Sequence, residues 1–541
     1  MASKVWLDGN FITMDESRPR ASALVVRDGL VDYVGDRAEA ILRAGDGAEV
    51  RLLGGLTVVP GFNDNHVHAV FMGDHALALD LGGLDERGVV SLLKERYPRP
   101  RPGEVIRAFN WDYPACPQPR KELLDEAFPL NPVTLNQFSG HAQWLNSAAL
   151  RVLGISRGGP DPKTGTVLRD PDGEPTGIVR DLGDTVLSKR RSRAVYFDGR
   201  MREERLDIAL ETFARMGITS VQDNTWYYPE LLGLRRRFRR GELTTRFTAW
   251  SLGRRPLHRA AMDAAFALGV SVPDWLREGP VKFFLDGTFS TRNACLCEPF
   301  ADLAGGRGAP AEADLAAGGG SEGAAREAQL CEDVSAPLEE LAFLARRGRQ
   351  GAFHIIGDRG IAIFLDAYEE VLARYPRLRE LRIRIEHAQL IREIDIPRIA
   401  RLGVLVSAQP TALGSPEKDE LLLGRERALR AYPYRSLLDA GVRLSFGSDI
   451  PGESGCDPLR SIHMAANREG GERITVEEAL RCYTVGSAYA EFAEARKGML
   501  KAGMLADFAV LSQDISSVPR ERIGDTVVEE TVVGGRTVYR R

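Results

Sequence analysis

The sequence has few cysteines, no basic surplus and no long apolar run, and each absence excludes a class of protein. Its six cysteines in 541 residues form no CxxC pair, which argues against a disulfide framework and against a cysteine zinc site. With 72 basic and 76 acidic residues there is no positive excess to neutralise phosphates, so we expect no nucleic-acid partner. No run approaches the roughly 20 apolar residues of a membrane span, and the N-terminal residues MASKVWLDGN lack a secretory pattern. We expect a cytoplasmic protein with reduced thiols and no membrane partner.

The sequence pattern at both ends of the chain predicts short strands separated by turns. The stretches WLDGNFITMD and ASALVVRDGLVDYVG are β-rich near the N-terminus, and DFAVLSQDI and DTVVEETVVGGRTVY are β-rich near the C-terminus. Strand-rich termini suggest that the two ends pair into one small β-sandwich domain. We assign residues 1–58 and 491–541 to it.

The segment between the two ends alternates between apolar strand-like runs and helical stretches. Strand, helix and strand repeated at this spacing predict a parallel sheet. We expect an α/β fold, a (β/α)8 TIM-like barrel over residues 59–490, with one of its strands unidentified. The seven runs that we assign to strands are 58–68, 217–223, 279–287, 350–358, 381–389, 403–410 and 441–449.

Two stretches depart from this alternation. Residues from about 75 to 200 are irregular and proline-rich, which predicts an insertion subdomain in the barrel. Residues 301–331 are rich in glycine and alanine, which predicts a flexible loop.

The placement of the eight histidines is the strongest indication of chemistry. His66 and His68 form an HxH pair at the end of an apolar run, and residues i and i+2 of a strand point to the same face. Further ionisable residues lie in or end other apolar runs, where burial is costly unless they are paired or bound to a metal. They are Lys282, His354, His387 and Asp449.

The carboxyl ends of the strands of a (β/α) barrel share one face, where active sites lie. The six side chains would therefore surround one pocket. Imidazole and carboxylate together suit a divalent metal, with zinc first and Mn²⁺, Fe²⁺ or Co²⁺ as alternatives. The competing interpretation is that each histidine is an ordinary hydrogen-bonded core residue.

Several segments, in this order along the chain, resemble the amidohydrolase superfamily and within it the amidohydrolase-3, YtcJ-like hydrolases. They are PGFNDNHVH (60–68), SGHAQWLNSAAL (139–150), VKFFLDGTFSTRNA (281–294), FHIIGDRG (353–360), RIEHAQ (384–389), GSDIP (447–451) and KAGMLADFAVL (501–511). One departure is Gln409-Pro410-Thr411-Ala412, where the family often has QPxH.

The resemblance implies a ligand set for one or two metal ions. That set is His66, His68, Lys282, His354, His387 and Asp449. It also implies that Lys282 is an N6-carboxylysine bridging two metals, because an ammonium group has no lone pair with which to ligate. The alternative is an unmodified lysine beside a single metal.

The expected mechanism follows from the charge of the metal. Metal-activated hydroxide would attack a carbonyl carbon, with Asp449 as general base and then as proton donor to the leaving amine. We predict hydrolysis of a non-peptide carbon–nitrogen bond in a small molecule, an N-substituted amide or formamide by resemblance. The alternatives are a hydrolytic deaminase, an ester or lactone hydrolase, and a metal-binding regulator without turnover.

Further pocket residues are suggested less directly. By resemblance His141 would contact the substrate or polarise its carbonyl, and Trp111 would stack on an apolar substituent. Asp286 would orient Lys282 or contact substrate, and Gln222 ends a strand that faces the same mouth. For each of these residues, the alternative to a role in the pocket is a purely structural role. A homodimer is the default assembly, because closed two-fold oligomers are the commonest.

Overall fold

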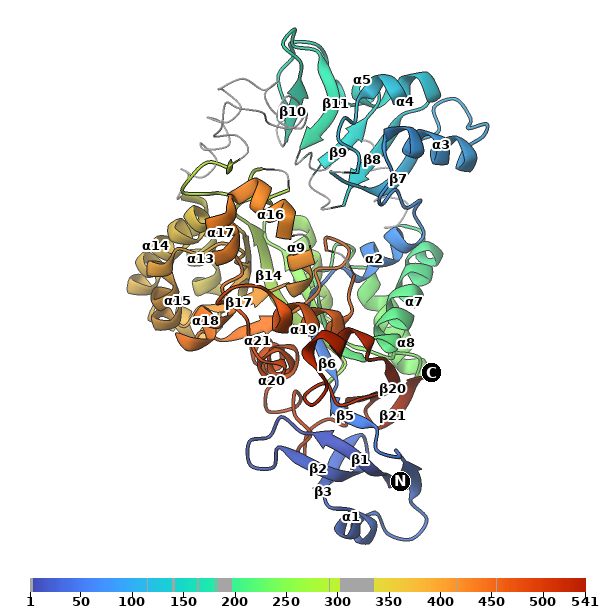
Figure 1. Cartoon of the computed structure of the whole chain (residues 1–541), viewed down its shortest axis with the longest axis vertical. Coiled ribbons are helices and arrows are strands. Elements are labelled where there is room, and N and C mark those ends of the chain that lie inside the picture. Colours follow the sequence, from blue (N-terminus) through green and yellow to red (C-terminus); the bar gives the residue numbers. More distant parts are fainter. Residues whose placement is uncertain are drawn as a thin grey trace.

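The computed structural model describes residues 3–113, 115–138, 142–162, 165–180, 182, 197–290, 292–301, 335–414, 416–453 and 455–541. Three sheets follow one another along the longest axis of the molecule, with the sheet of the chain termini at one end and the barrel in the middle (Figure 1). The third sheet belongs to the insertion at the other end (Figure 1).

The central sheet has eight strands, all paired in parallel, which confirms the predicted (β/α)8 class. In barrel order the strands are β6 (Phe62–Val67), β12 (Ile218–Asp223), β13 (Arg246–Leu252), β14 (Leu276–Phe284), β15 (Gly351–Ile355), β16 (Arg384–His387), β17 (Leu405–Ala408) and β18 (Leu444–Phe446). The strand that the sequence left unidentified is β13. Its run RFTAWSL is fully buried and rich in β-forming residues, but no histidine or carboxylate at its end draws attention to it.

The barrel closes between its first and last strands through the segment that follows β18. Val67 pairs with Ile450 in an isolated parallel bridge. The N–H of His68 donates to the carbonyl of Ile450 at 3.0 Å, and the N–H of Asp449 donates to that of His66 at 2.7 Å. The closing seam therefore runs through residues that the sequence assigns to the site.

Helices follow the strands and cover the barrel (Figure 1). In α14 the buried residues Ile361, Phe364, Leu365 and Tyr368 recur at helical spacing, so one apolar stripe faces the barrel. The helices of the barrel are α2 (Ala69–Ala76), α7 (Gly199–Arg215), α8 (Glu230–Arg240), α9 (Pro256–Ala267), α13 (Ser335–Arg347), α14 (Asp358–Arg374), α15 (Ile396–Leu402), α16 (Pro416–Leu423), α17 (Arg425–Arg430), α18 (Tyr434–Asp439), α19 (Pro458–Asn467), α20 (Val476–Arg481) and α21 (Ser487–Ala490).

Strands from both chain ends form a single sheet. Its order is β21 (Arg536–Arg540), β20 (Val528–Val533), β19 (Phe508–Leu511), β5 (Thr57–Pro60), β1 (Lys4–Ile12), β2 (Arg20–Arg27) and β3 (Leu30–Gly35), and β4 (Glu49–Leu52) pairs with β1. Helix α1 (Arg37–Ala44) packs on it. The two ends of the chain meet where β5 pairs antiparallel with β19. A buried ion pair between Arg246 of β13 and Asp507 fastens this sheet to the barrel.

The insertion has its own sheet and its own core. The strand order is β10 (Thr166–Arg169), β11 (Pro175–Arg180), β9 (Ala142–Leu145), β8 (Val133–Gln137) and β7 (Ile106–Trp111), with helices α3 (Glu86–Arg96), α4 (Lys121–Ala127) and α5 (Ser147–Leu153). Lys418 of α16 pairs with Asp112 at 2.9 Å, which ties the insertion to the barrel. The predicted loop at 301–331 lies outside the described residues except for Ala301.

In the part of the chain that the structure describes, no helix combines the length and apolar character that crossing a membrane requires. Cys116, Cys297, Cys456 and Cys482 are free thiols.

Candidate metal centre

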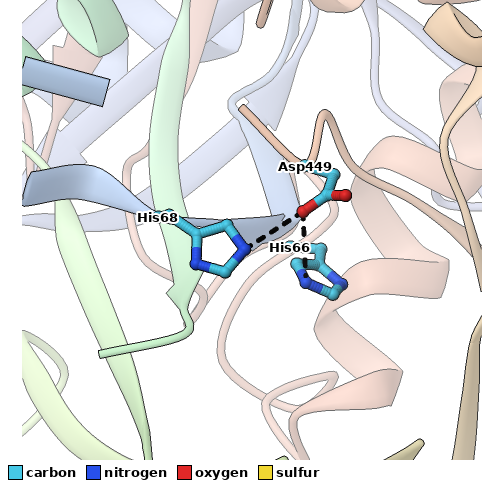
Figure 2. Close-up of side chains that lie close together, drawn as sticks. All are labelled: His66, His68 and Asp449. Atoms are coloured by element: carbon cyan, nitrogen blue, oxygen red, sulfur yellow. Dashed lines mark hydrogen bonds and ion pairs between the residues drawn. The ribbon is translucent and has the colours of Figure 1, made fainter. Parts of the chain in front are cut away.

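Two histidines and one aspartate lie together where the barrel closes (Figure 2). One potential ligand atom from each of His66, His68 and Asp449 lies within 4.8 Å of the other two. Oδ1 of Asp449 is 3.4 Å from Nε2 of His66 and 3.2 Å from Nε2 of His68. Imidazole nitrogen and carboxylate oxygen are donors that zinc and similar divalent cations bind.

Local backbone geometry brings these three side chains to one point. His66 lies on β6, and His68 two residues later is the N-cap of α2. Asp449 follows β18 and adopts φ of 54°, in the left-handed region that non-glycine residues rarely occupy. Such backbone persists where the surrounding structure imposes it, here through the hydrogen bond from Asp449 N–H to His66.

A buried ionic network orients His66. Its Nδ1 lies 2.7 Å from Oε2 of Glu386, and Arg384 binds Glu386 at 2.6 and 3.1 Å. An ionised carboxylate only accepts, so Nδ1 of His66 carries the proton and Nε2 keeps its lone pair for a ligand. Burial, followed by the charge of Lys282, lowers the pKa of His66 well below its ordinary value, so the ring is neutral.

His387 is oriented in the same sense by a different residue. Its Nδ1 lies 2.8 Å from Oε1 of Gln409, an amide oxygen that can only accept, so Nε2 is the unprotonated nitrogen. That Nε2 is buried and has no hydrogen-bond partner among the described residues. A buried polar atom without a partner calls for an explanation, and a metal ion would supply one.

Lys282 and His354 lie beside this group. Nζ of Lys282 is 3.4 Å from Nε2 of His66, and burial lowers the pKa of Lys282 to about 8. The ring centroids of His354 and His387 are 4.3 Å apart. Nε2 of His354 lies 3.1 Å from the carbonyl oxygen of Gly287, so ligation through this nitrogen would require that contact to break.

His68 makes a contact that competes with metal binding. The indole N–H of Trp226 donates to Nδ1 of His68 at 3.1 Å, so the neutral ring carries its proton on Nε2, which faces Asp449. Ligation through Nε2 requires the opposite tautomer and therefore loss of the Trp226 bond. His387 thus fits a metal as it stands, whereas Nε2 of His66 is shared with the amine of Lys282 and His68 fits once Trp226 releases it.

The structure does not bring two of the predicted pocket residues into this group. Trp111 is fully buried in the core of the insertion and donates its indole N–H to the carbonyl of Leu135 at 2.9 Å. Gln222 is also fully buried, with its amide bound to Arg384 at 2.5 Å and to the carbonyl of Ser487 at 2.9 Å. Both side chains therefore make contacts of the kind expected for a structural role, which was the alternative to substrate binding.

Asp286 organises the loops around the mouth of the barrel. Its carboxylate accepts main-chain N–H groups of Cys295, Ile356 and Gly357 at 3.0, 2.9 and 2.8 Å. It also lies 3.9 Å from Nε2 of His354. These contacts position the segment after β15. His141 lies outside the described residues.

Sequence reasoning missed three residues that set the histidine tautomers, namely Glu386, Gln409 and Trp226. For Glu386 a signal existed, because Arg384 and Glu386 alternate within a buried strand and charges in such a strand need partners. Gln409 stands in the segment that departs from the QPxH pattern. For Trp226 the sequence offers no comparable signal.

The sequence pattern of the amidohydrolase family matches residues 49–539. The chain is 28% identical to the putative amidohydrolase YtcJ of Bacillus subtilis, over 99% of each chain. It is 29% identical to the N-substituted formamide deformylase of Arthrobacter pascens, over 99% of this chain and 98% of that one. The crystal structure of an uncharacterized metal-dependent hydrolase from Pyrococcus furiosus has a TM-score of 0.68 at 28% identity, covering 95% of this chain and 100% of that one. The chain belongs to the amidohydrolase family and is a hydrolytic enzyme acting on carbon–nitrogen bonds.

Proposed function

We propose that this enzyme hydrolyses the carbon–nitrogen bond of a small N-substituted amide or formamide with the help of one or two divalent cations, zinc first. The observation that carries the proposal is the group His66, His68 and Asp449, whose potential ligand atoms lie within 4.8 Å of one another. The near full-length similarity to an N-substituted formamide deformylase supports the substrate class.

The proposed donor set has two parts. His66, His68 and Asp449 would hold one cation, and His354 and His387 would hold a second. An ammonium group cannot ligate, whereas a carboxylated Lys282 would offer two anionic oxygens between the two positions. Nζ of Lys282 lies 3.4 Å from Nε2 of His66, which supports a place for Lys282 beside the proposed first cation.

A bound divalent cation would lower the pKa of a coordinated water from about 16 to about 7. Asp449 would accept the proton of that water and pass it to the leaving nitrogen. Burial alone would raise the pKa of Asp449, but the hydrogen bond with His68 and the positive charge of Lys282 bring it below its ordinary range. The carboxylate is therefore ionised and able to accept a proton.

The test combines metal analysis with a substrate screen. Protein purified without chelator or nickel resin is analysed by plasma mass spectrometry, and intact mass reports whether Lys282 carries one added carbon dioxide. N-substituted formamides and amides are then screened for release of amine, with and without added zinc. We expect stoichiometric metal and metal-dependent release.

Each other outcome separates the alternatives. Failure to retain stoichiometric metal even after reconstitution would overturn the proposal. Metal together with ammonia release from ring amidines, and no amine release from amides, would replace it with deamination.

A further inference from the structure

The segment that begins at the end of β12 binds the chain on both sides of His68. The main-chain N–H of Asn224 donates to the carbonyl of Val67 at 2.8 Å. The main-chain N–H of Ala69 donates to Oδ1 of Asp223 at 2.7 Å. The residues immediately before and after His68 are therefore both held by one neighbouring strand end.

Asp223 supplies a helix cap that His68 does not. His68 is the N-cap of α2, and its side chain makes no capping hydrogen bond to that helix. The N–H groups of the first helical turn have no partner within the helix, and an N-cap side chain ordinarily accepts from one of them. Here the carboxylate of Asp223 accepts from Ala69 instead, and its negative charge suits the N-terminus of a helix. The imidazole of His68 is thereby left free for another contact.

The carboxylate of Asp223 is itself held in one position. Asp223 is 1% exposed, and its Oδ2 accepts from the hydroxyl of Thr225 at 2.7 Å. Glu230, the first residue of α8, is buried and hydrogen-bonded to Asp223. Burial, followed by the charge of Asp223, raises the pKa of Glu230 well above its ordinary value, so its carboxyl group is protonated and donates.

We propose that Asp223 is a positioning residue, which keeps the main chain of His68 in place for ligation of a divalent cation. Ligation through Nε2 of His68 costs the hydrogen bond from Trp226 to the ring. The contact from Asp223 is made to the main chain of Ala69, so it persists when the ring loses Trp226. The inference rests on the proposed function to the extent that a cation binds at this centre.

The experiment measures zinc affinity rather than turnover. Competition with a chromogenic chelator gives the dissociation constants of the full-length wild type, Asp223→Ala and Asp223→Asn. We expect Asp223→Ala to bind zinc at least about tenfold more weakly, the effect of losing a residue that supports a metal ligand. Asp223→Asn should restore most of the affinity, because its amide oxygen can accept from Ala69 and its NH₂ group can donate to Thr225.

Asp74→Ala is the matched control. Asp74 lies in the second half of the same helix, is buried, and pairs with Arg205 at 2.5 Å, so its removal also loosens α2. We expect lower unfolding temperatures in Asp74→Ala and Asp223→Ala, but weaker zinc binding in Asp223→Ala alone. The visible absorption bands of the cobalt-loaded protein, which report the ligand geometry, should likewise change only in Asp223→Ala.

Thr225→Val provides a milder change in case Asp223→Ala does not fold. It keeps the shape of the side chain and removes one donor to Asp223, so it should weaken zinc binding by about 2- to 10-fold, the effect of one hydrogen bond. Unchanged zinc affinity in Asp223→Ala, or in Thr225→Val where Asp223→Ala is unfolded, would overturn the inference. An equal loss in Asp74→Ala would also overturn it, because the effect would then belong to the helix as a whole.

Hydrolysis of N-substituted amides by the wild type is measured separately. Weaker zinc binding in Asp223→Ala without hydrolysis of any amide by the wild type would support the role of Asp223 and refute the proposed function. Zinc-dependent hydrolysis by the wild type, with equal zinc affinity in Asp223→Ala, would refute the role of Asp223 and leave the proposed function standing. Failure of the wild type to bind zinc would overturn both.

Discussion

Oε2 of Glu386 and Nδ1 of His66 lie 2.7 Å apart although 320 positions separate them in the chain. Glu386 is bound on its other side by Arg384, and all three side chains are buried. The contact determines which nitrogen of His66 faces the other candidate ligands. Partners of this kind also raise the basicity of the imidazole toward a metal.

Glu386→Gln should therefore weaken metal binding by about 10- to 100-fold. The amide keeps the size of the side chain but removes the charge that fixes the His66 proton. The dissociation constant is measured by competition with a chromogenic chelator. Glu370→Gln is the matched control, because Glu370 lies on the surface of α14 and pairs only with Arg374 among the described residues. Equal metal affinity in the two variants would contradict the role of Glu386.

His68→Ala and Asp449→Asn should separate binding from chemistry. His68→Ala removes an imidazole from the group, and we expect loss of metal and of activity together. Asp449→Asn keeps an oxygen donor but cannot accept a proton, so we expect much of the metal to remain while kcat falls by about 10³-fold or more. Metal content and kcat are measured on the same preparations. Wild-type turnover in Asp449→Asn would exclude the proton transfer assigned to it.

Trp226→Phe should strengthen metal binding by about 2- to 10-fold, the effect of one hydrogen bond. The indole N–H stabilises the His68 tautomer that cannot ligate through Nε2. Removing it frees His68, while the phenyl ring keeps most of the aromatic surface. Calorimetric titration with zinc gives the comparison, and weaker binding in the variant would show that the indole supports ligation instead.

His258 should make the fold less stable in acid. Burial, followed by the charge of Arg255, lowers the pKa of His258 from 6.5 to about 4. Between these values the unfolded chain binds more protons than the folded one, so the contribution of the neutral ring is complete above pH 6.5 and is lost as the pH falls towards 4.

The measurement is the apparent unfolding temperature of the wild type and His258→Gln at pH 7.5, 6 and 5. We expect the wild type to lose on the order of 2 °C more than the variant over this range. Parallel pH dependence in the two proteins would contradict the buried neutral ring.

Much of the barrel could be predicted from sequence because its strands are short buried runs that alternate with helices of regular spacing. β6, β14, β15 and β16 each carry an ionisable residue in or near an apolar run, which makes them conspicuous. β13 has the same burial but no such residue, and it was not identified. The candidate metal ligands could be predicted because these ionisable residues lie near strand ends, and the strand ends of a barrel share one face.

Contacts between distant parts of the chain were decided only by the tertiary structure. Asp449 reaches His66 and His68 because main-chain hydrogen bonds close the barrel there. The hydrogen-bond partners of Trp111 and Gln222 lie in the interior, and only the packing of distant segments brings these partners to them.

The sequence by itself predicted seven of the eight barrel strands and the types of the candidate ligands, because strand periodicity and the cost of burying charge are local properties. The tertiary structure alone decided which nitrogen carries the proton in His66, His68 and His387. Those tautomers depend on Glu386, Gln409 and Trp226, whose contacts are set by packing between elements and not by spacing along the chain.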